Sequence, residues 1–118
     1  MKIVKMNEVP KVTRNTSLFT GPVSSQPLVE DSNELRISIV SFGKGVKNKF
    51  HKHEADQVLI VTAGKGIVAT GVEERIVEMG DLIIFPAGEK HWHGATQDSE
   101  FSHLVVTRAG SKTTQLED

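Results

Sequence analysis

Histidine is the residue type whose positions in this sequence most directly indicate chemistry. None of the five histidines precedes residue 51, and four of them form two His-x-His pairs, His51 with His53 and His91 with His93. In an extended strand, residues two apart project from the same face, so each pair would present two imidazoles together. Two such pairs facing each other would supply nitrogen ligands for a divalent ion. The spacing therefore predicts a metal site.

Each histidine also has an ordinary explanation. One His-x-His pair could be two exposed polar residues on an edge strand, and it is the second pair that favours a metal site. His93 is predicted to be either a hydrogen-bond donor behind the ligands or a residue at the rim of the site. His103 is predicted to project into the interior, where it would act as a general base or be satisfied by a backbone carbonyl.

Strands rather than helices must position these histidines, because the apolar segments are short and rich in β-branched residues. Five such segments, separated by breaks that contain glycine or proline, occur at residues 36–41, 58–62, 75–77, 82–85 and 104–107. No window of eleven residues keeps apolar residues at helical spacing without an interrupting glycine or proline. Short strands at this spacing are typical of an all-β sandwich or barrel. Gly64 and Gly66 are predicted to flank a tight turn.

Length and composition restrict the function further. The chain has 118 residues, 37% of them hydrophobic and 25% charged, with a net charge of −1 and no cysteine, which predicts one small globular domain without disulfides. The absence of cysteine excludes thiolate zinc sites, iron–sulfur clusters and thiol nucleophiles. No apolar run has the length of a membrane-spanning helix or of a secretory signal, which favours a cytoplasmic protein. The near-neutral charge argues against nucleic-acid binding.

The ends of the chain differ from its middle. Residues 1–33 are predicted to form an N-terminal arm and edge strands, residues 34–108 the metal-binding barrel, and residues 109–118 a flexible tail, since the tail is polar and lacks periodicity. Apolar residues near the open edge need covering, which predicts a symmetric homodimer; the alternative is an arm folded back on its own barrel. The residues expected at or near the contact are Leu18, Phe19, Leu28 and Trp92.

Two motifs resemble the paired signature motifs of the cupin superfamily. They are Gly45-x5-His51-x-His53-x3-Gln57-x6-Gly64 and Gly80-x5-Pro86-x-Gly88-x2-His91. The resemblance covers roughly residues 34–108 and implies a single-domain jelly-roll β-barrel with a metal site inside its mouth. The metal ligands that it implies are His51, His53, Gln57 and His91. Two positions depart from the family pattern: Gln57 stands in place of the usual glutamate, and Ala95 in place of the usual asparagine. In cupins with the glutamine, its side-chain oxygen remains a ligand.

The glutamine changes the chemistry that such a site would perform. Three imidazoles and an amide are neutral, so they would leave the full double positive charge on the ion, whereas a glutamate would halve it. The more electrophilic ion would act as a Lewis acid on a substrate oxygen. Nitrogen and oxygen ligands suit manganese or iron, which we favour, and also nickel or zinc.

A narrower resemblance extends to about residues 18–108. Residues 89–96 and 102–104, with residues 19–23 and 27–28 upstream, are similar to small single-domain cupins that include manganese-dependent hydroxynitrile lyases. In those enzymes the histidine that matches His103 is the base. The resemblance implies a metal-dependent lyase that acts on a small oxygenated substrate. The residues expected to line its substrate pocket are Ser38, Val40 and His93.

Two other functions remain open at this point. Other glutamine-containing cupins are dioxygenases or sugar isomerases, so the same metal site could serve oxygen-dependent cleavage or isomerisation. A protein that binds a small molecule without turning it over is the third hypothesis. Oxygen uptake separates the dioxygenase from the lyase, and tight binding without turnover would indicate the third.

Overall fold

Strands make up almost all of the regular structure. The computed structural model describes residues 1–118 and contains ten strands and one short 3-10 helix. The elements are η1 (Met6–Glu8), β1 (Val12–Arg14), β2 (Val23–Val29), β3 (Leu35–Phe42), β4 (His51–His53), β5 (Gln57–Thr70), β6 (Glu74–Glu78), β7 (Leu82–Phe85), β8 (His91–Ala95), β9 (Phe101–Arg108) and β10 (Thr113–Gln115). The five segments predicted as strands lie within β3, β5, β6, β7 and β9.

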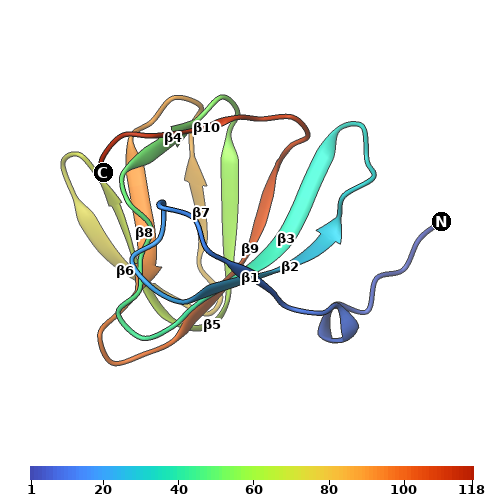
Figure 1. Cartoon of the computed structure of the whole chain (residues 1–118), viewed down its shortest axis with the longest axis horizontal. Helices are drawn as coiled ribbons and strands as arrows, with labels where there is room; N and C mark the ends of the chain where they lie inside the picture. Colours follow the sequence, from blue (N-terminus) through green and yellow to red (C-terminus); the bar gives the residue numbers. More distant parts are fainter.

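The strands form two antiparallel groups that curl into a barrel (Figure 1). One group has the order β1-β2-β3-β9-β5, with β7 also paired to β5. The other has the order β5-β8-β4-β10, with β6 also paired to β5. The long strand β5 therefore belongs to both groups. This arrangement confirms the predicted all-β class and the small jelly-roll barrel.

The tight turn predicted at Gly64 and Gly66 is wrong, because β5 continues through both residues. Gly64 has a φ of +71°, and the residue just before β9 approaches so closely that a Cβ at this position would collide with the carbonyl oxygen of Glu100. The glycine thus lets the strand bend from one group to the other without ending. A register shift between Val61 and Ala63 accompanies the bend.

The barrel core packs around fully buried aromatic and aliphatic side chains. Phe42, Leu59 and Phe101 have 2% or less of their surface exposed. The strand register aligns Val40 of β3, His103 of β9 and Val61 of β5 in one row, and residues directly opposite each other project from the same face of a sheet. The register therefore places His103 on the inner face of its sheet, among apolar neighbours.

The C-terminal segment predicted as a flexible tail contains a short strand. Residues 113–115 form β10, which pairs with β4 in antiparallel register. Beyond the strand, the Leu116 amide donates to the Phe50 carbonyl over 2.8 Å. The polar composition of the segment concealed it, because an edge strand facing solvent needs no apolar periodicity.

The N-terminal residues before β1 run away from the barrel, and η1 lies on this stretch (Figure 1). Ile3 and Met6 are exposed there. No helix in the structure has the length and hydrophobicity that crossing a membrane would require.

Candidate metal centre

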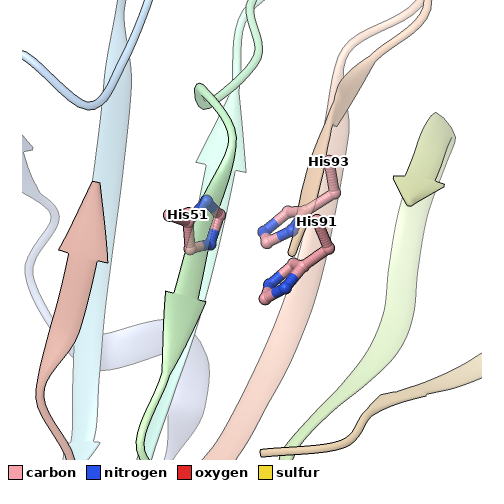
Figure 2. Close-up of side chains that lie close together, drawn as sticks. All are labelled: His51, His91 and His93. Atoms are coloured by element: carbon pink, nitrogen blue, oxygen red, sulfur yellow. The ribbon is translucent and has the colours of Figure 1, made fainter. Parts of the chain in front are cut away.

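Imidazoles from β4 and β8 meet inside the barrel. His51 and His91 are register partners, and their ring centroids lie 4.3 Å apart. His91 and His93 project from β8 towards His51 (Figure 2). Each of these three buried histidines offers a ring nitrogen within 4.8 Å of the others. A cluster at this spacing suits a divalent metal ion, and the contacts of each ring decide which of its nitrogens is available to bind one.

Backbone carbonyls fix the orientation of two of these rings. The Nδ1–H of His51 donates to the Lys49 carbonyl over 2.6 Å, and the Nδ1–H of His91 donates to the Glu89 carbonyl over 2.8 Å. A carbonyl oxygen only accepts, so the proton of each neutral imidazole is at Nδ1 and the lone pair is at Nε2. Both rings therefore present a nitrogen lone pair for a ligand.

His53 and Gln57 complete a set of donors that fits a cation. His53 contacts the Thr113 hydroxyl through Nδ1 over 2.9 Å, while its buried Nε2 has no partner. The Oε1 of Gln57 lies 3.3 Å from Nε2 of His91. With the His91 proton at Nδ1, both of these atoms carry lone pairs, so a cation placed between them would be bound by both. The neutral nitrogen and oxygen donors thus fit a divalent transition-metal ion.

Burial keeps these histidines neutral. Loss of hydration lowers the pKa of His53 to about 4 and that of His91 to about 3, and it also lowers the pKa of His51. The first cause in each case is desolvation, which disfavours the charged imidazolium. At neutral pH no proton has to leave these rings before a metal binds.

His93 differs from its neighbours because an asparagine contacts its ring. Asn48 places its amide nitrogen 3.2 Å from Nε2 of His93, whereas the buried Nδ1 has no partner. The backbone N–H of His93 donates to Oδ1 of the same asparagine over 2.8 Å. Sequence reasoning missed Asn48, because no motif links it to a histidine 45 residues further along the chain.

His103 is completely buried, as the sequence predicts, and only one of its nitrogens is satisfied. Its Nδ1–H donates to the Leu104 carbonyl over 3.2 Å, while Nε2 has no partner. The ring lies edge-on to His93, with centroids 4.9 Å apart. Desolvation lowers the pKa of His103 to about 4. A backbone carbonyl therefore satisfies Nδ1 and leaves a lone pair on Nε2.

A cavity of about 150 Å³ adjoins the histidines. Its lining residues are Arg14, Leu18, Phe19, Ser25, Ser38, Val40, Phe42, Asn48, His51, His53, Gln57, His93, His103 and Val105. All three residues expected in the pocket, Ser38, Val40 and His93, are among them, whereas Arg14 was not foreseen. An engineered apolar cavity of about this volume accommodates one benzene molecule, which sets the size of ligand that fits inside. A larger groove, of about 610 Å³, lies against β6 and β7 and contains no histidine.

Comparison with known proteins identifies the family. The family model described as the Cupin domain matches residues 38–107. The chain is 38% identical over 93 residues to an (R)-mandelonitrile lyase of Granulicella tundricola, across 75% of this chain and 70% of that enzyme. It is also 36% identical over 62 residues to an acireductone dioxygenase of Pseudomonas paraeruginosa, of which it spans only 33%.

A solved structure gives the same result at the level of the fold. A cupin-like protein of Thermotoga maritima superposes with a TM-score of 0.84 at 30% identity, over 90% of this chain and 84% of that one. The family match covers both histidine pairs and more than half of the sequence. The chain is therefore a member of the cupin family.

Proposed function

We propose that this protein is a metal-dependent lyase that cleaves or forms a carbon–carbon bond next to an oxygen atom of a small substrate. The observation that carries the proposal is the unpartnered Nε2 of His103, in a residue that lines the same cavity as the histidine cluster. The similarity to a hydroxynitrile-cleaving enzyme over most of both chains supports this reaction type.

The proposed ligands are the residues that converge from the two motifs. They are His51, His53, Gln57 and His91. The observations that favour them are the free Nε2 lone pairs, the lack of a partner at Nε2 of His53 and the short approach of the Gln57 oxygen to His91. Manganese or iron is favoured, and nickel or zinc also suits this donor set. When bound, the ion would act as a Lewis acid on a substrate oxygen.

His103 would act as the general base. The carbonyl of Leu104 holds the proton at Nδ1, so Nε2 can accept the proton of a substrate hydroxyl. Because burial keeps the ring neutral, the base is ready at physiological pH. Val40 lies directly opposite His103 on β3 and lines the cavity, so it would help to exclude water from the proton transfer.

Replacement of the base tests the proposal. We expect His103→Ala to lower the rate of cleavage of a small aromatic cyanohydrin by about a hundredfold or more, with metal content unchanged. Released aldehyde measures the rate, and elemental analysis measures the metal. A matched control is Arg108→Gln, on the same strand but exposed and outside the cavity lining, which should leave the rate unchanged. Full turnover by His103→Ala would refute the assignment of the base.

The second candidate is a metal-dependent dioxygenase, which the similarity to acireductone dioxygenase favours. A dioxygenase consumes dioxygen and needs a redox-active ion, whereas the proposed lyase runs under nitrogen and tolerates zinc. We expect equal cyanohydrin cleavage under air and under nitrogen, without oxygen uptake. Oxygen uptake coupled to turnover would favour the dioxygenase. Ligand binding without turnover, by protein carrying its full complement of metal, would indicate a non-catalytic cupin.

A further inference from the structure

Asn48 and His93 are joined by three hydrogen bonds deep in the barrel. The backbone N–H of Asn48 donates to the His93 carbonyl over 2.9 Å, and the backbone N–H of His93 donates to Oδ1 of Asn48 over 2.8 Å. The third bond links the Asn48 side-chain nitrogen to Nε2 of His93 over 3.2 Å. Only 4% of Asn48 and 3% of His93 is exposed, so water does not compete for these groups.

The directions of these bonds assign the proton on His93. A backbone N–H always donates, so the atom of Asn48 that accepts from it must be the side-chain oxygen. The side-chain nitrogen then faces Nε2 of His93, and an NH2 group only donates. Nε2 must therefore carry the lone pair that accepts this bond. A neutral His93 has its proton on Nδ1, which is the buried nitrogen without a partner.

This assignment separates His93 from the other histidines of the cluster. His51 and His91 present lone pairs, whereas His93 presents an N–H group, which is the wrong polarity for a metal ligand. We infer that His93 remains outside the metal coordination and donates its Nδ1–H to an oxygen of the bound substrate, and that Asn48 is the residue that positions it.

The inference deepens the proposed function and depends on it for the substrate. His93 and His103 line one cavity, one as a hydrogen-bond donor and the other as an acceptor. A ligand that matches both has an oxygen acceptor close to a hydroxyl group. A buried donor without a partner is costly in the free protein, and a ligand oxygen would satisfy it.

Nitrogen NMR tests the assignment without any measurement of turnover. In zinc-loaded, 15N-labelled protein, a long-range 1H–15N spectrum distinguishes a protonated ring nitrogen from a free or metal-bound one. We expect Nδ1 of His93 to be protonated and Nε2 to be unprotonated, and we expect acetate to shift the Nδ1–H signal. An unprotonated or zinc-bound Nδ1, or an acetate titration that leaves the signal unmoved, would overturn the inference.

A nearly isosteric variant tests the role of Asn48. Asn48→Asp replaces the NH2 donor by a carboxylate oxygen, so Nε2 of His93 should gain a proton, and an affinity for acetate that depends on His93 should fall several-fold. Asn33→Asp makes the same change at an exposed position and should alter neither property. If Asn48→Asp leaves Nε2 unprotonated, Asn48 does not position the ring. A failure of lyase activity would not affect either readout.

The register of β1 places a charged side chain, that of Arg14, beside the cavity. Arg14 lies opposite Val23, and Val23 lies opposite Phe42, whose side chains are both buried. Residues opposite each other share a face, so Arg14 is on the face of the sheet that also carries His103, and its side chain is exposed at the edge strand β1. Arg14 is the only charged side chain that lines the cavity, and no acidic group pairs with it.

We propose that Arg14 selects substrates that carry a carboxylate at the mouth of the cavity. All the other lining side chains are apolar, hydroxyl, amide or neutral imidazole groups, so they leave its positive charge uncompensated. A guanidinium binds a carboxylate through two parallel hydrogen bonds. The alternative role of an inward charge on an edge strand is to prevent edge-to-edge aggregation. As with His93, the substrate role depends on the cavity being the active site.

Two probes of the same shape separate these roles. Benzoate and benzamide differ in charge, and their binding to metal-loaded protein can be measured by calorimetry. We expect Arg14→Gln to weaken the binding of benzoate about tenfold and the binding of benzamide less than twofold. Arg14→Lys should retain most of the preference, and Arg108→Gln, an exposed position outside the cavity, should retain all of it. No benzoate binding by the wild type, equal losses for both probes, or aggregation without a change in preference would overturn the proposal.

Discussion

The histidines of the candidate site are largely shielded from water, but they differ in whether each ring presents a nitrogen lone pair or an N–H group to its neighbours. Carbonyl groups fix the proton of His51 and His91 at Nδ1, and Asn48 fixes the proton of His93. The two motifs predict that these residues come together, because alternation along a strand sets which side chains share a face. They do not predict the tautomer of His93, because its partner belongs to a different segment of the chain.

Burial of neutral histidines makes the metal-free protein sensitive to acid. The pKa of His103 is about 4 in the folded state against 6.5 for the ordinary side chain, so between these values the unfolded chain binds more protons. The contribution of neutral His103 to the free energy of unfolding should therefore be complete above pH 6.5. As the pH drops towards 4, this contribution should be lost, which lowers the free energy of unfolding by about 3 kcal/mol for His103 alone. Urea unfolding at several pH values, with a chelator present, measures this. A urea midpoint that does not change with pH would contradict this expectation. His103→Gln should reduce the dependence of the midpoint on pH.

Gln57 sets the charge of the proposed metal site. Gln57→Glu would add one negative charge beside the ion, so we expect tighter metal retention against a chelator and slower cyanohydrin cleavage, on the order of tenfold. Chelator titration and steady-state rates provide the two measurements. An increase in rate would mean that electrophilicity of the ion does not limit the reaction.

At the scale of single elements, β5 shows where sequence patterns stop being informative. The glycines within it indicate a turn by composition, yet the strand bends and continues because β9 runs alongside it. Whether a glycine with positive φ ends a strand or bends it depends on the neighbouring strand, which is distant in the sequence. The strand segments themselves were predictable, since their β-branched residues depend only on local sequence.

The bend at Gly64 should tolerate no side chain. We expect Gly64→Ala to lower the free energy of unfolding by at least about 2 kcal/mol, because a Cβ would collide with the Glu100 carbonyl at a positive φ. Gly71→Ala is the control, since nothing lies within 4 Å of a Cβ there and its φ is not positive. Its stability should stay within about 0.5 kcal/mol of the wild type. Equal effects from both substitutions in urea unfolding would contradict the prediction.

The C-terminal strand β10 contributes one contact to the candidate metal centre. The Thr113 hydroxyl contacts Nδ1 of His53, so Thr113→Val removes the group that orients this ring. We expect metal affinity to fall by about tenfold or more. Thr114→Val changes the next residue, which pairs with exposed Lys52, and should leave the affinity unchanged. Competition with a chromophoric chelator gives both values, and identical affinities would show that His53 needs no such support.

At the scale of the whole molecule, the homodimer remains a prediction. The burial of the expected contact residues within one chain reduces the number that a partner could reach. Leu28 and Trp92 are already 7% and 8% exposed within one chain, and Lys47 covers the Trp92 ring at 4.2 Å. These two residues therefore offer little surface to a partner. The apolar residues of the extended arm, Ile3 and Met6, remain exposed.

We expect light scattering at micromolar concentration to give twice the mass of one 12.9 kDa chain. Removal of residues 1–11 should shift the protein towards the mass of a single chain, because it removes the exposed apolar arm without removing a barrel strand. A single-chain mass for the full-length protein would refute the dimer. A dimer that persists without the arm would place the contact elsewhere.

The pairing of β10 with β4 also fixes an order of events during synthesis. β4 has only three residues, and on its other side it pairs with β8 at a single position, His51 with His91. A growing chain that has not reached residue 113 therefore lacks the strand that holds β4 along its full length and the hydroxyl that orients His53. Capture of the proposed metal by the complete set of donors would consequently wait until residues 113–115 have been made and paired with β4, so the ions available to the folded barrel would decide which metal is taken up.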